Sequence, residues 1–234
     1  MSVFAVDRRT ASGGVIVQVR SRHPSSFGVA RLVLGAGEVA RTGCEAMATS
    51  YGVTSSGSPR RGGMRALVGD SLPESTYTAG PQGGWVDVAP GLPGDVHTIE
   101  LDGKTGWCVA RDSWLAAAAT VRLDTRWQGF QPMFGGQAGF LAHVTGQGQL
   151  VLACCGALDV HELRTGEFVT IDTGHLVAYV DTVQSRLRQS EQGRAQSLRT
   201  GAGLVFDFAG PGRVVTQTRN PRRLSSWLHA AGGH

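Results

Sequence analysis

The chain has 234 residues, which is enough for one or two domains and for a sizeable hydrophobic core. It contains no apolar run of roughly eighteen residues, so no helix is expected to cross a membrane, and 22 basic against 18 acidic residues are too balanced to indicate nucleic-acid binding by themselves. The 34 glycines exceed the usual ~7 per cent and follow no collagen period, which indicates many tight turns and an all-β protein.

Residues 1–27 are expected to form a loose lead-in and one strand. Residues 1–12 have their charges after a very short apolar run and lack the long hydrophobic region of a signal peptide. The chain also has no C-x-x-C spacing and no framework typical of a small secreted protein. We therefore expect reduced thiols and a cytoplasmic location. The cysteines are Cys44, Cys108, Cys154 and Cys155.

Strands and loops alternate along the first part of the chain. Apolar runs rich in β-branched residues predict strands at residues 15–19, 30–34 and 96–101. The segment around Pro24, residues 20–26, is expected to be a loop. Residues 54–63 are rich in Ser, Gly and Pro and predict a surface loop.

Residues 113–119 contain four consecutive alanines, and alanine has the highest helix propensity. Their place in the repeat described below matches residues 175–179, whose aromatic and β-branched side chains suit an extended chain. We therefore predict a strand. Two proline-broken apolar segments, residues 89–93 and 130–134, are candidate contact surfaces, because exposed Phe and Met are enriched at interfaces.

One helix is predicted, over residues 221–229. Asn220 can cap it, and Pro221 suits its first turn. Leu224, Trp227 and Leu228 recur at helical spacing and would share one face. Residues 221–234 therefore form a C-terminal helix and tail.

Two glycine landmarks recur along the chain. Alternating apolar runs flank Gly146 and Gly210, a weaker copy lies at Gly80, and the interval between successive copies is nearly constant. Alternation indicates strands and glycine supplies positive φ, so we predict a β-hairpin at each. A second kind of turn recurs at almost the same interval. The predicted turn glycines are Gly37, Gly103, Gly166, Gly146, Gly148, Gly210 and Gly212.

The agreement of the two landmarks predicts an internal repeat of about 65 residues, and units of that kind pack on one another to complete their cores. We expect a single all-β domain over residues 28–222, built from three lobes around a pseudo-threefold axis. The lobes are placed at about residues 28–94, 95–157 and 158–220.

The C-terminal half also carries a family resemblance. Residues 156–178, with the sequences ALDVHEL, GE and VTIDTGHLVA, resemble the bacterial branch of the altered-inheritance-of-mitochondria number twenty-four family. Residues 203–205 and 210–214, followed by 217–220, are similar to the closing motif of that family. With a weaker match through residues 62–79, the resemblance covers residues 28–222.

This resemblance implies an all-β fold like that of the tryptophan RNA-binding attenuation protein. It also implies a family whose molecular activity is poorly defined, and whose eukaryotic members are associated with mitochondrial inner-membrane organisation. It supplies no catalytic or ligand residues to carry over. The resemblance therefore suggests a non-catalytic scaffold or partner-binding protein with a link to membrane or envelope organisation.

The densest polar cluster is a possible metal site, because imidazoles with carboxylates suit Zn or Fe. Its members are His161, Glu162, Glu167, Asp172 and His175. The spacing favours surface and turn roles, since strand alternation turns Glu162 away from His161 and Glu167 falls in a turn. We expect no metal, and keep a metal-binding β-barrel enzyme centred on His161, Asp172 and His175 as the alternative.

Nucleophilic catalysis is not indicated either. No Gly-x-Ser-x-Gly occurs, and the Gly-x-Gly breaks have strands on both sides, unlike a dinucleotide fingerprint. Alternation predicts one of Cys154 and Cys155 in the core and the other outside, as structural cysteines. We therefore expect no active site and no cofactor.

Eight arginines lie between residues 186 and 223 against only Glu191 and Asp207, which makes a possible basic patch. They are Arg186, Arg188, Arg194, Arg199, Arg213, Arg219, Arg222 and Arg223. Anionic lipid or RNA could bind there, but the aromatics of the segment, Phe206 and Phe208, are expected to face the core, so nucleic acid is disfavoured. Peripheral membrane contact stays open. The simplest expectation is a homo-oligomer or a complex with a protein partner, because the outer sheet edges of the lobes need cover.

Overall fold

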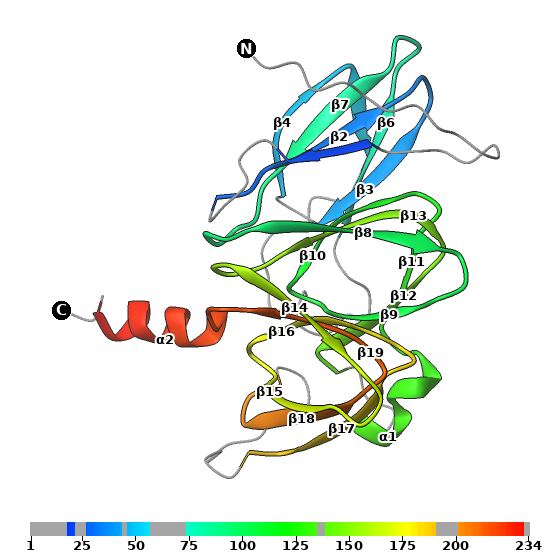
Figure 1. Cartoon of the computed structure of the whole chain (residues 1–234). Coiled ribbons are helices and arrows are strands. Elements are labelled where there is room, and N and C mark those ends of the chain that lie inside the picture. Colours follow the sequence, from blue (N-terminus) through cyan, green and yellow to red (C-terminus); the bar gives the residue numbers. More distant parts are fainter. Residues whose placement is uncertain are drawn as a thin grey trace.

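The structure is a computed structural model and describes residues 18–21, 27–43, 46–56, 74–134, 139–190 and 201–231. Antiparallel strands make up most of these residues, so the protein is all-β as predicted (Figure 1). None of the helices in these ranges has the length and apolar content that crossing a bilayer requires.

Within the described residues, three consecutive sets of six strands follow a short first strand, β1 (Gln18–Ser21). The first set is β2 (Ala30–Leu34), β3 (Val39–Gly43), β4 (Met47–Tyr51), β5 (Val53–Ser56), β6 (Glu74–Ala79) and β7 (Gly84–Val88). The second set is β8 (Val96–Asp102), β9 (Trp107–Ala110), β10 (Trp114–Ala118), β11 (Arg122–Asp124), β12 (Leu141–Thr145) and β13 (Gln147–Ala153). The third set is β14 (Leu158–Leu163), β15 (Phe168–Asp172), β16 (Leu176–Val180), β17 (Gln184–Gln189), β18 (Leu204–Ala209) and β19 (Gly212–Gln217).

Each set pairs its strands in the same order. The first, sixth and third strands form one antiparallel group, which is β2-β7-β4, β8-β13-β10 or β14-β19-β16. The fourth, fifth and second strands form the other group, which is β5-β6-β3, β11-β12-β9 or β17-β18-β15. Figure 1 shows the three sets one above another in chain order.

Neighbouring sets share sheets. Strand β3 of the first set pairs with β10 of the second, and β9 of the second set pairs with β16 of the third. Each of these two junctions joins two three-stranded groups into a six-stranded sheet. A series closed around an axis within one chain would also need β15 to pair with β4, and among the described residues β4 pairs only with β7 and β15 only with β18. The pseudo-threefold arrangement is therefore not confirmed.

The predicted hairpins are wrong, although the glycines lie at turns. The strands on either side of Gly80, Gly146 and Gly210 do not pair with each other but belong to different sheets: β6 and β7, β12 and β13, β18 and β19. Backbone φ is +116° at Gly146 and +146° at Gly212, while Gly210 precedes a cis proline. These turns pass the chain from one sheet to the next. Positive φ is also found at Gly37, Gly103, Gly148 and Gly166.

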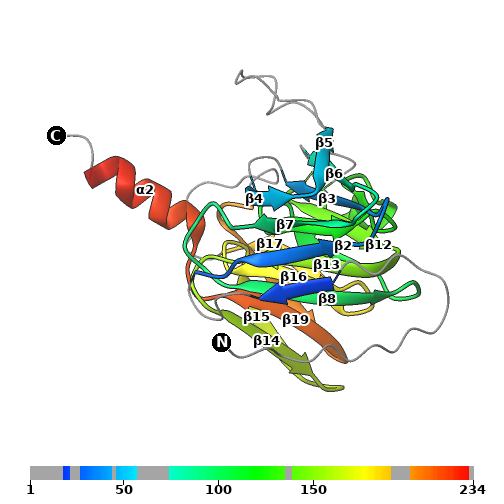
Figure 2. The same cartoon turned by 90° about the horizontal axis from the view of Figure 1, so that it is seen from above.

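Two difficult assignments are confirmed. Residues 113–119 contain strand β10, as the repeat position predicted against the helix propensity of alanine. The C-terminal helix is α2 (Pro221–Ala231), and the Asn220 side chain accepts a hydrogen bond from Arg222 N at 3.0 Å, as a cap does. In Figures 1 and 2, α2 projects outward from the strands.

Other expectations fail at element boundaries. Strand β1 runs to Ser21 inside the expected loop, and β5 occupies the start of the expected surface loop at residues 54–63. The polar composition of β5 reflects an exposed edge strand that pairs with β6. Residues 1–12, 15–17, 22–26, 57–63, 232–234 and Cys44 lie outside the described residues.

The segment at residues 130–134 is not a contact surface. It contains a short 3-10 turn, η2 (Gln128–Phe130), and α1 (Gln131–Phe134), and Phe130 and Phe134 are both buried. Their rings pack on each other at 5.6 Å, and Phe134 packs on Phe140 at 5.5 Å. The two phenylalanines thus form core and not interface. By contrast, Leu92 in the other proposed contact segment is exposed.

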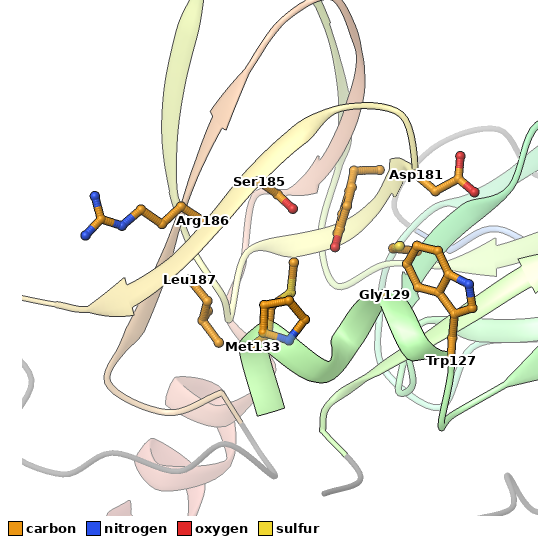
Figure 3. Close-up of a pocket in the computed structure, with 10 residues that line it drawn as sticks. Trp127, Gly129, Met133, Asp181, Ser185, Arg186 and Leu187 are labelled. Carbon is orange, nitrogen blue, oxygen red and sulfur yellow. The ribbon is translucent and has the colours of Figure 1, made fainter. Parts of the chain in front are cut away.

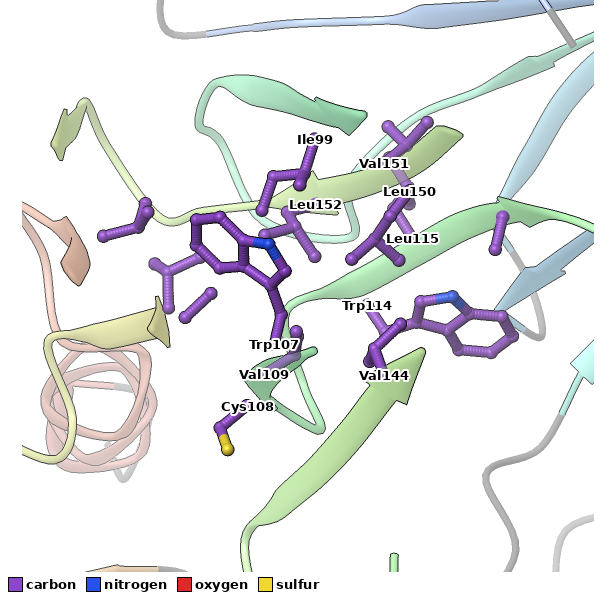
Figure 4. Packing of buried hydrophobic residues seen from close by; sticks show 14 of the residues in the cluster. Ile99, Trp107, Cys108, Val109, Trp114, Leu115, Val144, Leu150, Val151 and Leu152 are labelled. Carbon is purple, nitrogen blue, oxygen red and sulfur yellow. The ribbon is translucent and has the colours of Figure 1, made fainter. Parts of the chain in front are cut away.

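The core runs through all three sets and includes Trp107 and Trp114. Figure 4 shows Ile99 and Leu152 beside the ring of Trp107. Phe206 and Phe208 are fully buried, as strand alternation predicted. Cys154 and Cys155 are both buried, so the prediction that one of them faces outward is wrong. The chain leaves β13 at that point, and alternation no longer applies there.

Candidate functional site

The predicted metal cluster is distributed over separate hydrogen-bonding positions. Nε2 of His161 lies 3.0 Å from the Thr216 hydroxyl, and Nδ1 of His175 donates to the Gln217 carbonyl at 2.8 Å. The Asp172 carboxylate accepts a hydrogen bond from Gly174 N at 2.8 Å within its own turn. Across the described ranges, no group of three His, Cys, Asp or Glu residues is placed to hold a metal ion.

Instead, the turn at residues 172–175 is fastened to the end of β19. The Gln217 amide donates to the Gly174 carbonyl at 3.0 Å and accepts from Cys155 N at 2.8 Å. Asn220 packs so closely on Gly174 that a Cβ there would collide with it. The motif therefore builds a joint between two strand ends and the start of α2, and its polar residues serve the fold.

A cavity of about 440 Å³ lies between the η2–α1 segment and strands β9, β16 and β17. Small-molecule sites commonly fall in the range of roughly 300–1,000 Å³. Its lining residues are Cys108, Trp127, Gly129, Pro132, Met133, Tyr179, Asp181, Ser185, Arg186 and Leu187. Figure 3 shows Met133 and Leu187 at one end, Trp127 and Asp181 at the other, and Arg186 extending away.

One end of the cavity has a fixed polar arrangement. Asp181 Oδ2 lies 2.9 Å from His143 Nε2, and the His143 ring stacks on Trp127 with the centroids 3.9 Å apart. Gly106 lies directly beneath both partners, where a Cβ would strike the His143 ring and the Asp181 carboxylate. This close packing holds the imidazole in one orientation between an indole ring and a carboxylate.

A second polar group lies deeper. Tyr179 and Cys108 are opposite each other across the β9–β16 junction, and both line the cavity together with Ser185. Burial raises the pKa of the Cys108 thiol to about 12, and burial also raises the pKa of Tyr179 well above its ordinary value. Both groups are therefore protonated at neutral pH, so Cys108 is not an activated nucleophile.

The predicted basic patch is divided among several elements. Arg186 and Arg188 lie on β17, Arg213 on β19, and Arg222 and Arg223 in α2. Arg188 is paired with Asp207 at 2.6 Å, and Arg213 lies over the Trp107 ring at 5.1 Å from its centroid. Arg219 lies between β19 and α2, and Arg194 and Arg199 lie outside the described residues. Apart from Arg213, the described arginines form two small groups, on β17 and around the start of α2.

Helix α2 has no buried residue. Its large apolar side chains are open to solvent, with Trp227 64% and Leu228 53% exposed. The helix contains no acidic residue, and the chain has none after Asp207. It therefore presents arginines near its start and an apolar face with no partner among the described residues.

Among the described residues, strands β4 and β15 each have a sheet edge with no neighbouring strand, and we call these the free edges. Their counterparts, β10 and β16 for β4, and β3 and β9 for β15, are all paired on both sides. All five residues of β4 are exposed, whereas all five residues of β10 and of β16 are buried. Tyr51 on β4 is 70% exposed and Phe168 on β15 is 77% exposed. These two edges thus expose the surface that the other sets bury.

Sequence reasoning missed both the His143–Asp181 pair and the free edges. A signal existed for His143, since a polar residue inside an otherwise apolar strand must find a partner. A signal also existed for β4, whose sequence MATSY is far more polar than WLAAA in β10 or LVAYV in β16. The sequence did not show that β4 occupies in the first set the position of β10 and β16 in the other two.

Comparisons with known proteins agree with this fold. A protein of Streptococcus pyogenes serotype M6, named Uncharacterized protein M6_Spy0233, is 27% identical over 166 residues, which are 70% of this chain and 66% of that protein. The chain thus spans slightly less than two thirds of that relative. The crystal structure of protein SPYM3_0169 from Streptococcus pyogenes superposes with a TM-score of 0.72 at 23% identity, covering 92% of this chain and 99% of that one.

The match to a family is broader. Residues 19–219 fit the family described as Mitochondrial biogenesis AIM24, and they include every strand from β2 to β19. The segment also contains the fastened turn at residues 172–175 and both free edges. The chain therefore belongs to the AIM24 family.

Proposed function

We propose that this protein is a non-catalytic scaffold that works by association, most simply with copies of itself. The observation that carries the proposal is the pair of free edge strands, β4 and β15, whose counterparts are all covered within the chain. An exposed strand offers a row of unpaired backbone groups to another chain. Aromatic side chains such as Tyr51 and Phe168 add the apolar contact that interface cores favour.

A non-catalytic role is supported by the way the polar residues are used. His161, Asp172 and His175, which would centre a metal enzyme, each make a hydrogen bond within the fold. The Cys108 thiol is protonated and buried. The metal-binding alternative has its own test, since a stoichiometric ion in purified protein that is lost on His175→Ala would favour it.

Light scattering tests the scaffold proposal. The expected result at micromolar concentration is a mass that is a multiple of the 24.6 kDa chain and that falls on dilution. A strict monomer across that range would refute it. Size-exclusion chromatography of the same samples at two salt concentrations separates β-edge association from charge-driven clustering, because salt screens only the latter strongly.

Helix α2 favours a second candidate, contact with an anionic membrane surface. Amphipathic helices with basic residues and Trp or Leu on one face lie in the bilayer interface, and each basic residue near an anionic surface adds about 1 kcal/mol. Arg222 and Arg223 precede the exposed Trp227 and Leu228 on this helix.

Co-sedimentation with vesicles containing phosphatidylglycerol tests this candidate. Binding is expected for the whole chain, and loss of binding for Arg222→Glu/Arg223→Glu. The matched control Arg186→Glu changes an exposed arginine on β17 and should bind as before. Equal binding by both variants would exclude α2 as the contact. RNA is disfavoured, since Phe206 and Phe208 are fully buried and unable to stack on bases.

A further inference from the structure

We infer that the partner of β4 is strand β15 of a second copy of this chain, in an antiparallel pairing that repeats the two junctions already present inside the molecule. This inference rests on the proposed scaffold function and names its partner. Strand β15 occupies in the third set the position that β3 and β9 hold in the first two, and β4 occupies the position of β10 and β16. The first and last sets therefore each have one strand with a free edge, β4 and β15, and together these two strands correspond to the two sides of a third junction.

The correspondence of β4 with β10 and β16 is marked by an irregularity in each. The pairing of β10 with β13 skips Leu115, and that of β16 with β19 skips Val177. The pairing of β4 with β7 skips Ala48 at the same place. The next residue in each strand, Ala116, Ala178 and Thr49, is therefore equivalent, and β4 already has the shape of a junction strand.

Both existing junctions locate the paired residue on β4, and the first junction, whose leading turn has the same length as that of β15, locates its partner. Ala118 lies opposite Ala40 in the first junction, and Val180 lies opposite Trp107 in the second. Both Ala118 and Val180 stand two residues beyond the aligned position, as Tyr51 does in β4. On the other strand, Ala40 stands three residues after Gly37.

The turns that lead into β3 and β15 have equal length, so Val169, three residues after Gly166, is equivalent to Ala40. Tyr51 is then placed opposite Val169 of the next copy. The same register places Ser50 opposite Thr170 and Thr49 opposite Ile171. Thr, Tyr, Val and Ile have high strand propensity, which suits such a pairing.

The composition of the edges agrees with this assignment. Proteins protect solvent-facing edges with charged residues and proline. Most edge strands whose counterparts are also unpaired by another set follow this rule, with Asp159 and Glu162 in β14 and Arg186 and Arg188 in β17, whereas β5 has neither a charge nor a proline. Strand β4 has no charged residue and no proline, and β15 has a single charge, Asp172, at its last position.

The contact is heterologous, because it joins two different edges of the molecule. Each copy that docks covers one free edge and supplies another of the same kind, so an open assembly always keeps one free β4 and one free β15 at its ends. Such contacts give a closed ring when the rotation between copies closes, and a filament when it does not. A single molecule by itself leaves both of these strand edges unpaired.

Disulfide trapping tests the pairing and its register. Opposite residues of antiparallel strands have Cα atoms about 4.5–5.5 Å apart, within disulfide range. We would prepare Ser50→Cys and Thr170→Cys as separate proteins, both in a Cys44→Ser background, then mix and oxidise them. The expected product is a covalent dimer with twice the mass of the 24.6 kDa chain, and neither protein alone should give it.

The matched control combines Thr54→Cys with Thr170→Cys. Thr54 is an exposed residue on β5, whose counterparts β11 and β17 are not paired by another set, so no dimer is expected. A mixture of Ser50→Cys and Thr170→Cys that forms no more dimer than this control would overturn the inference. Thr170→Cys loses a hydrogen bond to Asp207, so circular dichroism checks its fold.

Hydrogen exchange on the unaltered chain gives a second measurement. Raising the protein concentration should slow amide exchange in β4 and β15 and leave β5 unchanged. Unchanged exchange in β4 and β15 would contradict the pairing. Light scattering separates the two proposals: an oligomer without cross-linking keeps the scaffold and rejects this junction, and a monomer rejects both.

Discussion

Gly146 and Gly166 both have positive φ, but their surroundings differ. A Cβ on Gly146 would collide with the Thr120 carbonyl, while no atom lies within 4 Å of a Cβ on Gly166. Gly146 therefore meets two requirements at once, a left-handed backbone and a close approach of two chain segments. Gly166 meets only the first.

We expect Gly146→Ala to lower the free energy of unfolding by clearly more than the ~1 kcal/mol typical of an average substitution. Gly166→Ala loses only the ease of its backbone conformation and should cost about 1 kcal/mol. Urea denaturation of the two variants measures the difference. Equal losses would show that the Thr120 contact relaxes freely.

Asp181→Ala is expected to destabilise by about 1–3 kcal/mol, because it leaves the His143 ring nitrogen buried without its partner. Asp159 on β14 is exposed, so Asp159→Ala serves as the matched carboxylate control and should change stability by less than about 0.5 kcal/mol. Thermal unfolding at neutral pH provides the comparison. A similar melting temperature for both variants would contradict a structural role for the pair.

Turn glycines were predictable from the sequence because their spacing and flanking alternation are local signals. The His143–Asp181 contact was not, because the two residues are 38 positions apart and meet only through the β9–β12 and β9–β16 pairings. The same limit explains the metal hypothesis. His161, Asp172 and His175 are close in sequence, but the two histidines contact residues of β19 and Asp172 contacts Gly174 in its own turn.

Among the helical elements, α1 belongs to a segment that was a candidate contact surface but contributes a phenylalanine to the core. Phe134 is 1% exposed and contacts both Phe130 and Phe140. We predict that Phe134→Ala costs about 3–5 kcal/mol, as large-to-small changes of buried aromatics do. Its neighbour Met133 is only partly buried, so Met133→Ala should cost less. Chemical denaturation tests the order, and a larger loss for Met133→Ala would reverse the assignment.

Strand existence was easier to predict than strand partnership. The position of β10 in the repeat correctly outweighed the helix propensity of its alanines. The hairpins were wrong because alternation with glycine describes a turn equally well when the chain enters a neighbouring sheet. Strand β5 was missed because its polar residues are typical of a loop, although an exposed edge strand can have the same composition. The η2–α1 segment was missed because four-residue helices are too short to show a helical pattern in the sequence.

For the molecule as a whole, the shared sheets couple the three sets of strands. Each six-stranded sheet takes half of its strands from one set and half from the next, so every set shares at least one of its two strand groups with a neighbour. We therefore predict a single calorimetric transition, with equal calorimetric and van't Hoff enthalpies. Two resolved transitions would show that one set unfolds independently. For an oligomer, the comparison is made at several concentrations, since association shifts the midpoint.

The junction between β9 and β16 also contains a built-in reporter of its own opening, the thiol of Cys108. Cys108 is wholly inaccessible there and its thiol has a pKa of about 12, so a soluble alkylating reagent meets a reactive thiolate only after the strands part. The rate of Cys108 alkylation under native conditions would therefore report how often β9 and β16 separate. If association at β4 and β15 makes opening of the β9–β16 junction less frequent, the alkylation rate should fall as protein concentration rises. A constant rate would show that association at the outer edges does not affect this inner junction.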